Sequence, residues 1–405
     1  MSLRNGVARR TLITVVVGLV LVLGAGLPAD AVAPDTGFSG GWVQVKQPRP
    51  NRAAGVATDR RLTFALLSTD SSEGLLLRCY TPAGTPCGRF GGGDGTVTGR
   101  DLGYRQAGPI GVTVDHHRRV LVVLGGPTYD SCRVVRLLPD GRLDRHFGRG
   151  GTTLVGGSSA MAVTVDGRDR TVVAGSRGMG PTNSDLSVVR LTTGGALDRT
   201  FGRRGRATFS VNKTEWFTSV TTDAANRVVA AGITTPFPGT ARTRAVVARF
   251  TIAGRLDRTF SRNGWLTTGD PGHASSATGV GATRRGVAVG LYTDRSNAAG
   301  LAMLTARGSV SRVTVRQCPA RCGLTVSTWS RGRLLLTGWV GAGRLALGTL
   351  APSGRLHVAG LRTVPHGATG TSLAPRHDGI VMVAGTSSDD LDESLDFSVV
   401  AAARP

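Results

Sequence analysis

The sequence predicts an all-β fold assembled from repeated units, and three observations support this expectation. Glycine accounts for 59 of the 405 residues, and Gly, Asp and Pro separate short runs of Val, Thr and Leu, a pattern typical of short strands and tight turns. An apolar run that ends in glycine recurs roughly every 50 residues. The chain is also longer than one ordinary compact domain unless that domain is built from repeats. Together these features predict a seven-bladed β-propeller of four-stranded blades, closed by the N-terminal strand.

The clearest repeat has the core Gly-x-Leu-Asp-x-x-Phe. It occurs at residues 139–151, 193–205 and 252–264, and weaker relatives occur at residues 83–90 and 352–356. The apolar runs that precede these motifs end at Gly125, Gly175, Gly232, Gly290, Gly338 and Gly385, and the first unit has residues 64–68 at the same place.

The second unit shows how one repeat is expected to fold. Residues 110–114, 119–124, 132–138 and 151–155 are four short apolar segments with turn residues between them. Continuous apolar segments of this length are typical of strands that are covered on both faces. A single sheet cannot cover its own faces, so the units must stack.

The two ends of the chain predict how the ring closes. The last unit has three strands, at residues 371–375, 379–385 and 396–402, and lacks a fourth. Residues 38–43 parallel residues 260–266, which begin a fourth strand in an earlier unit. We therefore expect the N-terminal strand to complete the last blade. Six or eight blades are the alternatives, because units one and five are degenerate.

The repeat resembles the delta-60 repeat family of bacterial proteins. Their units read Val-Val-Ala-Gly, then Phe-Ala-Val-Val-Arg-Leu, then Asp-Gly-x-Leu-Asp-x-x-Phe-Gly-x-x-Gly, and residues 172–175, 187–191, 195–205 and 396–400 fit these segments. Units one, five and six depart from the pattern, and unit five has Gly308-Ser309-Val310 where Gly-x-Leu-Asp is expected. The resemblance implies a propeller-like, exported protein and supplies no catalytic residue.

Residues 1–33 have the organisation of a secretory signal peptide. Arg4, Arg9 and Arg10 precede an apolar run at residues 12–27, and small residues up to Ala33 offer a cleavage site. An uncleaved anchor is the alternative, but the run is shorter than the ~20 residues that a spanning helix needs. Arg9 and Arg10 leave twin-arginine export open. We expect residues 34–405 to form the propeller, without a membrane span, in the secreted fraction or the cell envelope.

The chain is strongly basic, with 49 Lys and Arg against 26 Asp and Glu and a net charge of +23. Nearly all of the positive charge is arginine, which binds phosphate and carboxylate groups through paired hydrogen bonds. An anionic cell-envelope polymer is therefore one candidate partner, a surface protein is another, and GC-rich codon usage is the alternative explanation. The arginines are spread along the chain, so a nucleic-acid partner is not expected.

The chain contains five cysteines, and an exported protein meets oxidising conditions. We expect disulfides between Cys79 and Cys87, which flank a hairpin turn, and between Cys318 and Cys322. Cys132 precedes an apolar pair and is expected to be a buried thiol. Residues 318–322 resemble half of a zinc knuckle without the other half, so zinc is not expected there.

No catalytic, metal-binding or cofactor-binding residue is predicted. Asp144, Asp198 and Asp257 recur after Leu in the motif and are expected to accept hydrogen bonds from the following backbone, as in Asx-turns. Three further segments are interpreted structurally: Ser39 as part of a repeat turn, residues 389–393 as solvated acids, and His116 with His117 as turn residues.

Three function classes therefore compete. The first is a non-catalytic binding or scaffold protein of the cell envelope or its surroundings. The second is an adhesin-like protein that binds a polyanion. The third is a polymer-degrading enzyme with its site at the channel mouth, since propellers host many activities.

Overall fold

The computed structural model describes the chain from residue 33 to residue 404 with gaps. The described residues are 33–34, 38, 42–45, 51–59, 61–69, 74–104, 108–126, 128, 131–178, 183–212, 214–235, 242–283, 285–295, 298–317, 322–340, 344–362, 369–376, 380–387 and 397–404. The predicted signal peptide, apart from Ala33, lies outside them.

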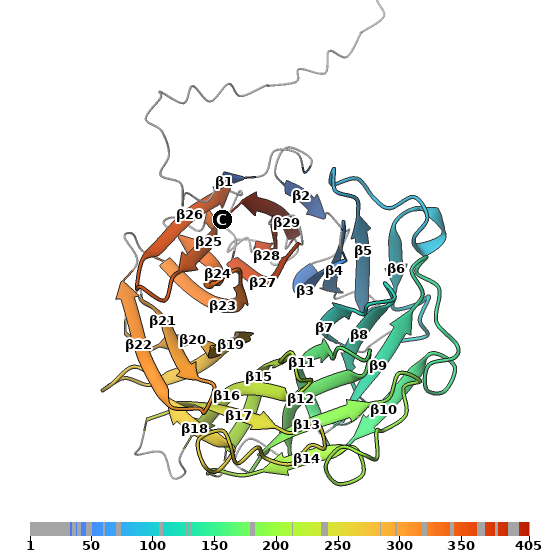
Figure 1. Cartoon of the computed structure of the whole chain (residues 1–405). Helices are drawn as coiled ribbons and strands as arrows, with labels where there is room; N and C mark the ends of the chain where they lie inside the picture. Colours follow the sequence, from blue (N-terminus) through green and yellow to red (C-terminus); the bar gives the residue numbers. More distant parts are fainter. Residues whose placement is uncertain are drawn as a thin grey trace, which may run out of the picture.

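The strands form sheets that radiate around one axis, and the first strand of each four-stranded sheet lies nearest that axis (Figure 1). Three four-stranded sheets from the first half of the chain are β3 (Asn51–Asp59), β4 (Leu62–Thr69), β5 (Leu75–Tyr80) and β6 (Thr96–Thr98); β7 (Pro109–Val114), β8 (Val120–Gly125), β9 (Ser131–Leu137) and β10 (Thr152–Gly156); and β11 (Ser159–Val165), β12 (Thr171–Arg177), β13 (Asp185–Leu191) and β14 (Arg206–Phe209).

Three more four-stranded sheets follow in the same order. They are β15 (Thr214–Thr222), β16 (Val228–Thr235), β17 (Arg244–Phe250) and β18 (Trp265–Thr268); β19 (Ser275–Thr283), β20 (Gly286–Thr293), β21 (Ala298–Thr305) and β22 (Val310–Gln317); and β23 (Cys322–Ser330), β24 (Arg333–Val340), β25 (Arg344–Leu350) and β26 (Leu356–Arg362). We call these six sheets blades 1 to 6. A short 3-10 helix, η2 (Gly91–Gly93), precedes β6.

The prediction of seven four-stranded blades is wrong, because six sheets have four strands and the remaining sheet has five. This composite sheet contains β27 (Thr369–Pro375), β28 (Val381–Ser387) and β29 (Phe397–Arg404), together with β1 (Ala33–Pro34) and β2 (Trp42–Val45). β1 pairs with Ala403 and Arg404, whereas β2 pairs with residues 398–401. The outer edge of β29 is thus shared end to end by two short segments. The sequence analysis expected one strand there, from residue 38, but β29 has eight residues and β2 pairs with four of them, so Ala403 and Arg404 are left to pair with β1.

Within the repeats, local strand prediction was accurate. The four strands of blade 2 begin and end within one residue of the ranges expected from the sequence. Residues 120–124 of β8 are each at most 1% exposed, because neighbouring blades cover both faces of the sheet. Burial of each such Val or Leu contributes about 1.5–3 kcal/mol, which explains why the blades need one another.

The antiparallel strand order gives the ring two different faces. The turn between the first and second strands of a blade, here called the inner turn, lies at the same end as the loop between the third and fourth strands, here called the outer loop. We call this end the turn face. Inner turns surround the ring axis and outer loops lie towards the rim (Figure 1). No helix among the described residues is both long and apolar enough to cross a membrane.

Candidate functional site

Each Gly-x-Leu-Asp-x-x-Phe motif lies in an outer loop and is held by an arginine from the third strand. In blade 3, Arg190 is 1% exposed, and its Nε donates to Oδ2 of Asp198 at 2.8 Å. Its guanidinium lies 4.4 Å from the ring centroid of Phe201, and its Nη1 donates to the carbonyl of Ile252 in blade 4 at 2.8 Å. This arrangement, here called the arginine brace, links one blade to the next. It recurs as Arg136, Asp144 and Phe147, and as Arg249, Asp257 and Phe260.

The predicted role of the motif aspartates is confirmed. Oδ1 of Asp198 accepts a hydrogen bond from the amide of Thr200 at 3.1 Å, and Asp144 and Asp257 do the same with His146 and Thr259. Burial raises the pKa of Asp198, but the Thr200 and Arg190 hydrogen bonds outweigh this effect, so its pKa lies below the usual range. These carboxylates therefore hold the outer loops and the brace arginines in place.

The brace arginines were missed in the sequence analysis. An arginine recurs eight residues before each motif aspartate, and this spacing could have revealed the brace. The sequence analysis interpreted these arginines only as members of apolar strands. An arginine inside such a strand needs a buried acidic partner. That partner could have been sought among the recurring aspartates.

The inner turns repeat a second network. In blade 2, Oδ1 of Asp115 accepts the amides of His117 and Arg119, and Nε of Arg119 lies 2.6 Å from Oδ2 of Asp115. Asp166 with Arg170 and Asp223 with Arg227 repeat this pairing in blades 3 and 4. The fourth residue of each turn has a left-handed backbone, and these residues are Arg118, Asp169 and Asn226. Asp and Asn adopt this conformation more readily than Arg does.

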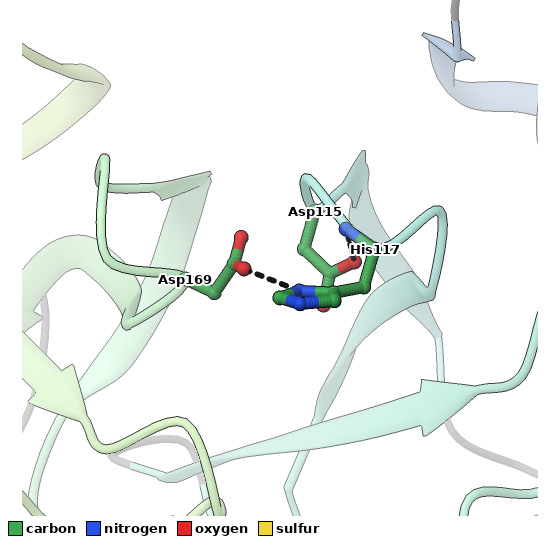
Figure 2. A group of neighbouring side chains, drawn as sticks. All are labelled: Asp115, His117 and Asp169. Atoms are coloured by element: carbon green, nitrogen blue, oxygen red, sulfur yellow. Dashed lines mark hydrogen bonds and ion pairs between the residues drawn. The ribbon is translucent and has the colours of Figure 1, made fainter.

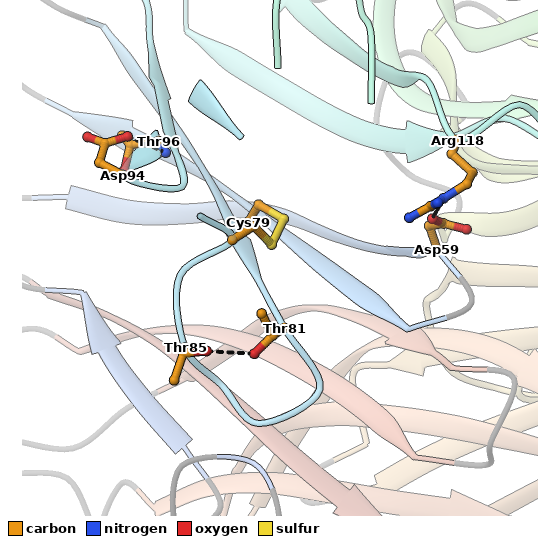
Figure 3. The surroundings of a disulfide bond; sticks show 8 residues. Asp59, Cys79, Thr81, Thr85, Asp94, Thr96 and Arg118 are labelled. Atoms are coloured by element: carbon orange, nitrogen blue, oxygen red, sulfur yellow. Dashed lines mark hydrogen bonds and ion pairs between the residues drawn. A yellow bond between two sulfur atoms is a disulfide. The ribbon is translucent and has the colours of Figure 1, made fainter. Parts of the chain in front are cut away.

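That fourth residue reaches back to the preceding blade. Nε of Arg118 donates to Asp59 at 2.6 Å, as Figure 3 shows. The carboxylate of Asp169 accepts the amide of His116 at 2.9 Å, and Oδ1 of Asn226 accepts the amide of Gly167 at 2.7 Å. The inner turns of blades 1 to 4 are therefore linked in a row around the axis.

The inner turn of blade 2 carries two histidines, which the fully described inner turns of blades 3 and 4 lack. Nδ1 of His116 lies 2.7 Å from Oδ1 of Asp169, and Nδ1 of His117 lies 2.6 Å from Oδ2 of the same carboxylate. The Asp169 side chain is 8% exposed, whereas the two imidazoles are 64% and 70% exposed. Figure 2 shows the ring of His117 directed towards Asp169, beside Asp115. Burial raises the pKa of Asp169, but the hydrogen bonds from His116 and His117 outweigh this effect, so the pKa lies below its ordinary value.

This His–Asp cluster, made of Asp115, His116, His117 and Asp169, was not anticipated. The sequence analysis noted the two histidines as turn residues, and Asp169 belongs to the next repeat. No local spacing connects them, so only the stacking of blades 2 and 3 brings them together. The adjacent repeat gave a weak signal, because aligned turns show His-His where blade 4 has Ala224-Ala225.

The turn face also carries most of the exposed arginines of blades 1 to 5. Those in inner turns and outer loops are Arg61, Arg89, Arg118, Arg142, Arg145, Arg149, Arg168, Arg199, Arg203, Arg204, Arg255, Arg258, Arg262, Arg285 and Arg307. Among the described residues of these turns and loops, only Asp94 is an exposed carboxylate, and the other acids are buried or half-buried. The surface of this face is therefore strongly positive.

The structure describes one of the two predicted disulfides. Cys79 and Cys87 form a disulfide with Cα atoms 5.4 Å apart (Figure 3). Cys318 and the side chain of Cys322 lie outside the described residues. Cys132 is a buried free thiol, and burial raises its pKa to about 12, although Arg206 opposes this shift.

Comparisons with known proteins agree with this architecture. A family model described as "Domain of unknown function (DUF5122) beta-propeller" matches residues 169–201. No curated protein matches the chain. The resemblance to delta-60 repeats stays a prediction.

The solved structures that resemble the chain include three enzymes. They are a streptogramin B lyase (12% identity, TM-score 0.53, 89% of this chain and 97% of that one), a puromycin hydrolase (15%, 0.50, 85% and 51%) and a polysaccharide lyase (9%, 0.48, 86% and 89%). The chain spans about half of the puromycin hydrolase. At these identities the likeness shows the fold alone. With the sheet arrangement, the likeness to the streptogramin B lyase and the puromycin hydrolase shows that this chain has a β-propeller fold.

Proposed function

We propose that this protein is an exported, non-catalytic binding protein that recognises an anionic polymer of the cell envelope through its turn face. The observation that carries this proposal is the separation of charge on that face. Arginines are exposed there, whereas nearly all of the described carboxylates of the same face are buried or half-buried in the arginine braces and inner turns.

The repeat explains why this surface suits a polymer. Arg145, Arg199 and Arg258 follow the motif aspartate in three successive outer loops, and all three are exposed. They therefore present guanidinium groups at regular intervals around the ring. Arginine forms paired hydrogen bonds with phosphate and carboxylate groups, so a chain with regularly spaced anions can contact several blades at once.

Few carboxylates of this face pair with its exposed arginines and neutralise their charge. The motif aspartates point inward to Arg136, Arg190 and Arg249, which are themselves at most 4% exposed. Arg142, which pairs with the half-buried Asp140, and Arg118, which pairs with Asp59, are exceptions on this face. Most of the surface arginines thus keep their charge available to a ligand.

A binding experiment with matched variants tests the proposal. The mature protein is titrated with polyphosphate and with heparin at several salt concentrations, because contacts between arginine and anions release counterions and give a steep salt dependence. The triple variant R145A/R199A/R258A should bind more weakly and with a smaller salt slope. The control R100A/R177A/R242A removes the same charge from exposed positions at the opposite end of the blades and should bind like the natural protein. Equal losses in both variants would refute a specific face.

Export is a separate part of the proposal and has its own test. Mass spectrometry of protein recovered from the medium or envelope should find an N-terminus near residue 34. Recovery of a peptide that begins at Met1 would contradict cleavage.

A polymer-degrading enzyme is the second candidate, and the His–Asp cluster near the ring axis is the observation in its favour. Incubation of the same polymers with the protein, followed by sizing of the products, separates the two candidates. Shorter products that disappear in the D169N variant would favour the enzyme.

A further inference from the structure

The inner turns of blades 2, 3 and 4 share one backbone design but differ in chemistry. Each begins with an aspartate that binds its own turn and the arginine four residues later. Blade 3 differs at the fourth position, where it has the carboxylate of Asp169 in place of Arg118 or Asn226. Blade 2 differs at the second and third positions, where it has two histidines in place of Ala224 and Ala225.

These two differences face each other across the boundary between the blades. The ligand atoms of Asp115, His117 and Asp169 all lie within 4.8 Å of one another. His117 lies against one oxygen of Asp169, and His116 lies against the other. The turn itself needs neither imidazole, because Asn226 maintains the same link between blades 3 and 4 with an amide oxygen and a backbone N–H.

We propose that Asp115, His117 and Asp169 bind one divalent transition-metal cation of the Zn²⁺ type. Imidazole nitrogen together with carboxylate oxygen is a donor set that suits such cations, and three protein ligands leave a position for water or an anionic group. Bonds to Zn²⁺ are about 2.0–2.2 Å long, so the ion must replace the hydrogen bond of 2.6 Å between His117 Nδ1 and Asp169 Oδ2, and these two atoms must move apart to admit it. The exposed His117 ring, which is 70% exposed, can make this adjustment.

The surrounding charges are compatible with a cation. Arg118 is held by Asp59 in blade 1, and Arg119 is held by Oδ2 of Asp115. In the described part of the chain, the carboxylate of Asp169 forms ion pairs with the two histidines and with no arginine. His116, on the second oxygen of Asp169, orients this carboxylate as groups around a metal ligand commonly do. The site depends on residues other than the arginines of the proposed polymer surface, so each proposal can fail alone.

Calorimetric titration of the untagged, chelator-treated protein with Zn²⁺ tests this site under non-reducing conditions. We expect one ion per chain and a higher melting temperature with Zn²⁺. D169N gives the blade 3 turn an asparagine, as Asn226 does in blade 4. H117A gives the blade 2 turn an alanine, as Ala225 does in blade 4. Both variants should therefore fold. Each should lose affinity by about 10–100-fold or more.

The control is H273A. His273 lies 2.7 Å from Asp294 on the opposite face and forms a His–Asp pair outside the proposed site. The H273A variant should bind Zn²⁺ like the natural protein. Unchanged binding in D169N and H117A, no binding by the natural protein, or equal loss in H273A would overturn the site. Mg²⁺ that binds as tightly as Zn²⁺ would overturn the assignment to a transition metal.

Discussion

Cys79 and Cys87 occupy in blade 1 the positions that Arg136 and Asp144 occupy in blade 2. Each pair is separated by eight residues. The amide of Cys87 donates to the carbonyl of Cys79 at 3.0 Å, and the amide of Asp144 donates to the carbonyl of Arg136 at 2.9 Å. The first blade therefore replaces the buried ion pair of the brace with a covalent bond at the same place.

Removal of this bond should destabilise the protein. We expect the double variant C79A/C87A to lose about 2–3 kcal/mol, because a short loop restricts the unfolded chain only modestly. Urea unfolding of the oxidised natural protein and the variant measures the difference. Reducing agent should bring the natural protein to the midpoint of the equally reduced variant, because the predicted bond between Cys318 and Cys322 is then broken in both samples. Identical midpoints for all samples would show that the disulfide contributes nothing.

Breaking an arginine brace should cost more than breaking the disulfide. R190M leaves the carboxylate of Asp198 buried without its main partner, for which a loss of about 3–5 kcal/mol is expected. The control R199M changes an exposed arginine nearby and should alter stability by less than about 0.5 kcal/mol. Thermal and urea unfolding measure both variants. The prediction fails when the two variants unfold alike.

The same carboxylates predict acid sensitivity. The pKa values of Asp198 and Asp257 are lowered, because hydrogen bonds from Thr200 or Thr259 and from the brace arginine outweigh the opposing effect of burial. Their stabilisation is complete above the unfolded-state pKa of about 3.9 and is lost as pH falls through the lower folded-state values. Urea midpoints between pH 7 and pH 2 should fall in that acidic range. The fall should be shallower in D198N/D257N, and equal slopes would contradict this origin.

The sequence predicted what depends on neighbouring residues and missed what depends on stacking. Strands such as β8 are continuous apolar segments between turn residues, so their ends could be located. The aspartates of the motif bind their own loop, so their role was predictable as well. The arginine brace and the His–Asp cluster join residues from different strands or blades, and a linear pattern does not show which of them meet.

The blade count failed for a related reason. Counting repeats treated the N-terminal segment as one regular strand, whereas β1 and β2 divide the edge of β29 between them. The repeat spacing contains no information about this division, because β1 has no counterpart in blades 1 to 6.

Phe38 offers a direct measure of how strongly the N-terminal segment is attached. Its side chain is fully buried, and its ring centroid lies 6.2 Å from that of Tyr80 in an edge-to-face arrangement. The same apolar cluster contains residues of blade 1 and of the composite sheet, among them Val56 and Met382. F38A should therefore destabilise the ring by about 3–5 kcal/mol, because it removes a buried aromatic ring where two sheets meet. The control I252A truncates a side chain that is 42% exposed and should change stability little. Urea unfolding compares the two, and an F38A midpoint equal to that of I252A would show that Phe38 does not stabilise this junction.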